Sequence, residues 1–126
     1  MSLEKKTTRT GTTWIEHGIL RFEYATGAEV SLDDAKDNVV VELELCGGTG
    51  LPCLIDIAGA KSVDQDARNY YSECKKFPAC ALIGVSPIAR IIGNIYLAVH
   101  GGGDTPTRMF RTETDAIAWL REYLPK

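Results

Sequence analysis

Apolar residues in the first part of the chain predict two strands followed by a helix. The segment Thr12–Ala25 carries its apolar residues in two groups on either side of a glycine turn at Gly18. Ser31 is followed three residues later by an acid, which is typical of a helix start. The residues after it fit a helical face, although Val41–Leu45 also alternates as a strand would. We interpret this stretch as a helix because the run is long and its start signal is good.

Two continuous apolar runs, Pro52–Ile57 and Ala79–Val85, predict strands that are buried on both faces of a parallel sheet. Between these strands, Asp64 is expected to begin a helix. The residues of this helix that would form its inner face are Ala67, Tyr70, Tyr71, Cys74 and Phe77.

The last third of the chain predicts a helix, a strand and a second helix. Ser86 and Pro87 supply a cap oxygen and a proline for the first turn, so that a helix is expected up to about His100. Thr107–Arg111 is the last predicted strand. Thr112, three residues before an acid, begins the closing helix.

The predicted order β-β-α-β-α-β-α-β-α indicates one α/β domain. Strands that alternate with helices form right-handed crossovers, and we therefore expect a mixed, mostly parallel five-stranded sheet. The domain would span residues 12–126, close to the commonest size of a single domain. Residues 1–11 are a polar lead that need not be ordered.

The charge and the apolar content exclude several classes of protein. The formal net charge is −3 and no run of lysine or arginine exceeds two residues, so that no nucleic-acid partner is expected. No apolar stretch approaches the roughly 18 residues of a membrane span. The first residues lack the apolar segment of a signal peptide, which predicts a cytoplasmic protein.

The four cysteines form no metal-binding or disulfide pattern. Cys46, Cys53, Cys74 and Cys80 lack a C-x2-C pair, and neither histidine is close to them in sequence. In a cytosolic chain these thiols are expected to stay reduced and buried. We therefore predict no metal site and no cofactor.

Two glycine-rich motifs have structural interpretations. His100–Gly103 resembles the oxyanion motif of esterases, which needs a G-x-S-x-G nucleophile turn. The nearest serine, Ser86, is followed by Pro87, which has no N–H to donate, and the three glycines are better placed to end a helix. Gly47–Gly50 precedes a strand, whereas a phosphate-binding loop follows one, so that a tight turn is predicted.

Acid–base chemistry has three candidate residues, His17, His100 and Asp56. Asp56 lies inside an apolar run and is expected near a strand end, where open parallel sheets bind their ligands. No nucleophile–base pair can be read from the sequence. We therefore expect a protein that binds rather than catalyses.

The predicted helix from Pro87 to His100 has few charges and offers a candidate interface. Its isoleucines form one face, which would meet the sheet. The other side predicts an interface with a partner or with a second copy of the chain in a homodimer. The residues there are Arg90, Gly93, Asn94, Leu97 and, on one flank, Tyr96.

The segment Leu54–Ala67, L-I-D-I-A-G-A-K-S-V-D-Q-D-A, resembles the central signature of STAS domains, the fold of bacterial anti-sigma-factor antagonists. That signature is a buried L-D-L strand followed by x-G-x-x-x-x-D-S-S-G at a helix start. Asp56 matches the acid of the strand, Gly59 the turn glycine and Asp64 the acid before the serines. The element order agrees over nearly the whole chain, and the C-terminal part resembles an uncharacterised SpoIIAA-like subgroup.

The phosphorylation switch of that family does not carry over. In the antagonists a partner kinase phosphorylates a serine of D-S-S-G, whereas Gln65 and Asp66 stand there in this chain and Ala67 replaces the glycine. Asp66 would supply a permanent negative charge at a helix N-terminus, where the dipole favours it, or it is simply an acid of the first helical turn. Ser62 is a nearby alternative phosphorylation site.

The resemblance implies a non-enzymatic regulatory module that binds a protein partner, such as a regulatory kinase or an anti-sigma-like protein. A small-molecule or lipid-binding carrier of the same fold is the alternative. The partner-binding residues carried over from the family are Lys61, Ser62, Asp64, Gln65, Asp66 and Arg68.

Overall fold

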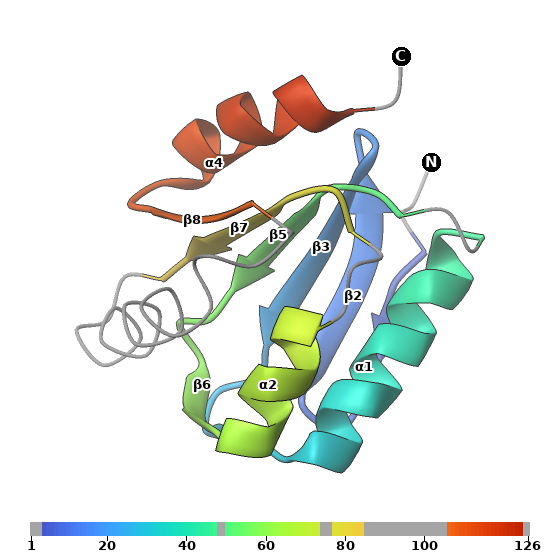
Figure 1. The fold of residues 1–126 in the computed structure, drawn as a ribbon, viewed down its shortest axis with the longest axis vertical. Helices are drawn as coiled ribbons and strands as arrows, with labels where there is room; N and C mark the ends of the chain where they lie inside the picture. Colours follow the sequence, from blue (N-terminus) through green and yellow to red (C-terminus); the bar gives the residue numbers. More distant parts are fainter. Residues whose placement is uncertain (1–3, 48–49, 74–76, 85–105, 125–126) are drawn as a thin grey trace.

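A six-stranded sheet forms the middle layer of the protein (Figure 1). The computed structural model describes residues 4–47, 50–73, 77–84 and 106–124. The strand order is β1-β2-β3-β5-β7-β8, with β1, β2 and β3 antiparallel to one another and β3, β5, β7 and β8 parallel. The predicted mixed, mostly parallel sheet is confirmed. Its strands are β1 Lys6–Thr7, β2 Gly11–Glu16, β3 Ile19–Tyr24, β5 Cys53–Asp56, β7 Cys80–Ile83 and β8 Thr107–Phe110.

The strand count corrects the prediction of five strands in two places. The polar lead contributes β1, which pairs with Thr12 and Thr13 of β2. This pairing uses backbone groups and needs no apolar side chains, so that the hydrophobic pattern gave no sign of it. A separate two-stranded parallel sheet joins β4 (Ala28–Val30) to β6 (Ala60–Val63). These strands are too short for a clear alternation.

Local sequence signals explain where the helices begin and end. Helix α1 (Leu32–Leu45) starts at Ser31, whose hydroxyl accepts from the Asp34 N–H while the Asp34 carboxylate accepts from the Ser31 N–H. It ends before Gly47, whose φ of 63° suits glycine. The helical interpretation of Val41–Leu45 is therefore confirmed. Helix α4 (Glu113–Leu120) has the predicted cap, Thr112.

Helices cover both faces of the sheet (Figure 1). Helices α1 and α2 (Gln65–Glu73) pack on one face, over a core that includes Phe22, Tyr24, Ala35 and Leu82. Helix α4 and the short helix η1 (Arg121–Tyr123) pack on the opposite face. The residues of this second core are Ile19, Leu54, Ala79, Ala81, Ala116 and Leu120.

The predicted inner face of α2 is confirmed for Ala67, Tyr70 and Tyr71, which pack on the first core. Phe77 lies in a bend rather than in a helix, and Cys74 lies outside the described residues. The helix predicted from Pro87 to His100 also lies outside them. None of the helices that the structure describes is long and apolar enough to cross a membrane.

Candidate functional site

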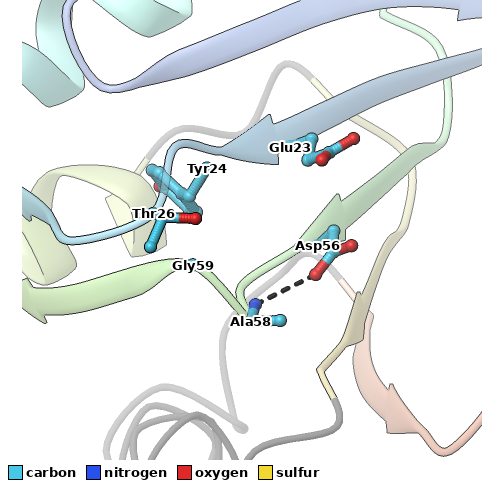
Figure 2. Close-up of a pocket in the computed structure, with 6 residues that line it drawn as sticks. All are labelled: Glu23, Tyr24, Thr26, Asp56, Ala58 and Gly59. Atoms are coloured by element: carbon cyan, nitrogen blue, oxygen red, sulfur yellow. Dashed lines mark hydrogen bonds between the residues drawn. The ribbon is translucent and has the colours of Figure 1, made fainter.

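A pocket of about 260 Å³ lies where the parallel strands β3 and β5 end (Figure 2). This is the edge at which open parallel sheets commonly bind their ligands. The pocket is shallow, and mostly polar atoms line it. Its lining residues come from β3 and the turn after it, and from β5 and the turn that leads into β6: Glu23, Tyr24, Thr26, Asp56, Ala58 and Gly59.

Asp56 and Gly59 shape the turn at the floor of this pocket. One carboxylate oxygen of Asp56 accepts a hydrogen bond from the Ala58 N–H at 2.9 Å, which is the geometry of an Asx turn (Figure 2). The carbonyl of Gly59 accepts from the Gly27 N–H at 2.8 Å. A Cβ atom on Gly59 would lie 2.5 Å from the carbonyl oxygen of Tyr24, so that only glycine fits between the two segments. The prediction that Asp56 lies near a strand end is confirmed, since it is the last residue of β5.

Two carboxylates lie side by side at the mouth of the pocket. Glu23 and Asp56 are register partners on neighbouring parallel strands, and their side chains therefore project from the same face of the sheet. Like charges placed opposite each other on neighbouring strands destabilise a sheet. In the described part of the chain, neither carboxylate forms an ion pair with a lysine or an arginine. The pocket is therefore a place where a positive charge would be favoured.

The structure brings the predicted partner-binding residues together on β6 and the first turns of α2. Three of them are exposed at the start of the helix: Asp64, Gln65 and Asp66. Lys61 is exposed on β6, and its Nζ atom lies 3.6 Å from Oε1 of Glu29 on β4. The half-buried members are Ser62 on β6 and Arg68 on α2.

The residue that replaces the signature glycine has a structural role. Ala67 is completely buried in the core beneath α2. Gln65 and Asp66, which stand where the family has its serines, point outward in the same turn. The departures from the signature therefore change the exposed charge while the buried position keeps a small side chain.

The candidate acid–base residues do not converge. His17 lies in the β2–β3 turn, where it and Gly18 both have positive φ, as a type I′ hairpin requires. This turn is at the opposite end of β3 from the Asp56 register position. His100 and the second candidate interface, Arg90, Asn94, Tyr96 and Leu97, lie outside the described residues.

The cysteines and acids of the described segments build no metal site. No group of three or more histidine, cysteine or acidic side chains in those segments could hold a metal ion. No disulfide joins Cys46, Cys53 or Cys80. Burial raises the pKa of the Cys80 thiol to about 12, which keeps it protonated.

Sequence reasoning missed Glu23 and Thr26 as members of the site. Glu23 is one exposed acid in an alternating strand, and such residues usually face solvent. Its importance depends on the register of β3 against β5, which joins segments about 30 residues apart. No motif or spacing in the sequence marked Thr26 as a site residue.

One solved structure is similar over nearly the whole chain. It is an uncharacterised protein of the DUF3478 family from Shewanella loihica PV-4, described as having a SpoIIAA-like fold. The match has a TM-score of 0.57 and 16% identity, and it covers 94% of this chain and 92% of that one. At this identity the similarity shows the fold alone.

A second solved structure is closer in sequence. This protein of unknown function from Arthrobacter sp. FB24 is 33% identical, and the match covers 82% of this chain and 92% of that one. Its TM-score of 0.32 is too low to support a shared arrangement. No curated protein matches the sequence significantly.

The element order and the sheet topology agree with the SpoIIAA-like fold that the resemblance in Leu54–Ala67 implies. A family model described as a domain of unknown function, DUF7793, matches residues 13–124. This match includes β2 from its third residue, every strand from β3 to β8 and all the described helices. The chain therefore belongs to the DUF7793 family.

Proposed function

We propose that the protein is a non-enzymatic binding module that recognises a basic segment of a protein partner. The binding surface consists of the pocket at the ends of β3 and β5 and the exposed start of α2. The observation that carries this proposal is the pair of carboxylates, Glu23 and Asp56, that line one pocket without a cation from the described residues. A lysine or arginine side chain of the partner would relieve their repulsion.

The start of α2 extends the same negative surface. Asp64 and Asp66 are exposed at one end of β6, and the pocket lies at the other end of this four-residue strand. A basic segment lying along β6 would therefore contact carboxylates at both ends. Such charges set partner choice and association rate more than affinity.

Because Gln65 and Asp66 cannot be targets of a serine kinase, phosphorylation at these two positions would not switch binding. In this respect the proposed module differs from the anti-sigma-factor antagonists that the signature resembles. A regulatory kinase or an anti-sigma-like protein stays a prediction for the partner. Self-association through the helix predicted from Pro87 to His100 stays a prediction as well.

The alternative function, a small-molecule or lipid carrier, is less well supported by this pocket. At about 260 Å³ it is smaller than the roughly 300–1,000 Å³ typical of ligand pockets. Its polar lining and its carboxylates suit a cationic group better than an acyl chain.

The test is a titration of ¹⁵N-labelled protein with an arginine-rich hexapeptide, followed by amide chemical shifts. The control peptide carries citrulline, which has nearly the shape of arginine without its charge. We expect shifts at Glu23, Asp56, Gly59 and the 64–66 segment with the arginine peptide alone, and weaker binding at higher salt.

Variants locate the binding surface. Glu23→Gln and Asp66→Lys should each weaken binding at least threefold. Both residues are exposed, and the melting temperature should therefore change little. The matched control is Glu122→Gln, which removes an exposed acid of η1, near the β2–β3 turn at the other end of β3 from the pocket. Equal effects of all three variants, or shifts spread over every acidic residue, would disprove a specific site.

A further inference from the structure

A buried polar cluster lies between α1, α2 and the sheet face that they cover. The Asn38 side-chain N–H groups donate to the Tyr71 hydroxyl at 3.1 Å and to the Thr10 hydroxyl at 3.1 Å. The hydroxyls of Tyr24 and Tyr71 are 3.2 Å apart and share one hydrogen bond. One of the two tyrosines donates its phenolic proton to the other. The phenolic proton of the tyrosine that accepts this bond then has no acceptor among the described residues.

Glu42 lies one helical turn after Asn38, on the same face of α1. It is only 7% exposed. In the segments that the structure describes, no group donates a hydrogen bond to its carboxyl group and no cation pairs with it. A buried carboxyl group without partners is rare, because its charged form loses the stabilisation that water gives it.

Among the residues that the structure describes, the groups around Glu42 offer no positive charge. It interacts electrostatically with Tyr24 of β3, Tyr71 of α2, Cys80 of β7 and Cys46 next to α1. On the sheet face that α1 and α2 cover, strand β2 presents the uncharged side chains of Thr13 and Ile15. These residues are the register partners of Phe22 and Leu20, and paired residues project from the same face. Asp34, two turns earlier on α1, is held by Arg9 and Ser31.

All four neighbours stay neutral at the pH where Glu42 titrates. Burial raises the pKa of Tyr71 and of Cys80 to about 12, and it raises the pKa values of Tyr24 and Cys46 as well. The same desolvation raises the pKa of Glu42 to about 8.

We propose that the protonation state of Glu42 controls how tightly α1 packs against α2 and the sheet. The neutral carboxyl group fits the buried interface. The ionised carboxylate needs more water than the closed interface supplies, and we therefore expect the C-terminal half of α1 to move away from α2 and β7. This control would operate whether or not α2 binds a partner.

Hydrogen–deuterium exchange from pH 6 to pH 9 tests the proposal, with each rate divided by the intrinsic rate at that pH. We expect the opening equilibrium of α1 and α2 to rise roughly tenfold per pH unit and to level off near pH 8. The opening equilibrium of helix α4, on the opposite face of the sheet, should rise less. Glu42→Gln should remove the rise, whereas Glu44→Gln, which changes an exposed acid on the same helix, should keep it. The proposal would be overturned if the opening equilibria of α1, α2 and α4 rose equally with pH, or if the rise in α1 and α2 were unchanged in Glu42→Gln.

A second measurement does not depend on a variant that folds. In wild-type protein with ¹³C-labelled glutamate, the side-chain carboxyl signal of Glu42 should titrate with a midpoint at least two pH units above those of the exposed glutamates. The amide signals of α1 should change with the same midpoint. A Glu42 midpoint near the ordinary 4.5 would overturn the proposal.

Discussion

At Gly59 the turn into β6 passes close to the backbone that follows β3. A Cβ atom at this position would lie 2.5 Å from the carbonyl oxygen of Tyr24 and 2.8 Å from that of Ala25. Both oxygens belong to the backbone, so that no rotation of a side chain can relieve the contact. Gly59→Ala must therefore displace the pocket floor or the segment after β3.

Two effects contribute to the expected loss of stability. Forcing an additional methyl group into a tightly packed region costs about 1–3 kcal/mol. Displacing the turn also weakens the hydrogen bond from the Gly27 N–H to the Gly59 carbonyl, at about 1 kcal/mol. We expect the free energy of unfolding to fall by about 2–4 kcal/mol, measured by urea denaturation followed by circular dichroism.

Gly47→Ala is the matched control. A Cβ atom at Gly47 would meet no described residue within 4 Å, but Gly47 has a φ of 63°. Alanine destabilises the left-handed conformation, but it also lowers the conformational entropy of the unfolded chain, which partly offsets this cost. We therefore expect Gly47→Ala to lower the free energy of unfolding by about 1 kcal/mol. If Gly59→Ala lost no more stability than Gly47→Ala, the backbone contact would not be the reason for glycine at position 59.

Two further predictions concern ionisable groups away from the pocket. The Arg9 guanidinium holds the pKa of Asp34 well below its ordinary 3.8. The contact between Arg9 and Asp34 therefore stabilises the fold fully above pH 3.8, and this stabilisation is lost as the pH falls through the lowered pKa of Asp34. Arg9→Gln should therefore destabilise the protein at pH 7, and urea denaturation should show the two proteins converging in strong acid. The raised pKa of Cys80 keeps nearly all of this thiol protonated at pH 8. Both Cys80 and Cys46 are half-buried, so that the difference in pKa decides the comparison. Iodoacetamide should therefore alkylate Cys80 more slowly than Cys46 in the native protein, as peptide mass spectrometry can measure, and a faster reaction at Cys80 would contradict its raised pKa.

The sequence predicted the elements whose signals are local. Ser31 and Thr112 begin helices because each hydroxyl accepts from a backbone N–H three residues later, and both partners are visible in the sequence. The apolar runs that became β5 and β7 were recognisable because a central parallel strand is buried on both faces. The fold class followed from the order of these elements.

Elements that depend on distant partners were not predictable in the same way. Strand β1 is polar and is a strand only because β2 lies beside it. The pairing of β4 with β6 joins two segments of three and four residues from different parts of the chain. The pocket has the same origin, since Glu23 and Asp56 meet only through the β3–β5 register.

Glu42 differs from these, because its burial follows from spacing already present in α1. The pattern around Val41–Leu45 contains two acids, and in a strand Glu42 and Glu44 would share one face. In a helix they point about 200° apart, because each residue turns the chain by about 100°. Ala35 and Val39 set the inward face of α1, and Glu42 lies seven and three residues after them, on that face, whereas Glu44 is exposed. The apolar neighbours therefore force the carboxyl group of Glu42 inward, and choosing a helix for this segment already implied that one of its acids would be buried.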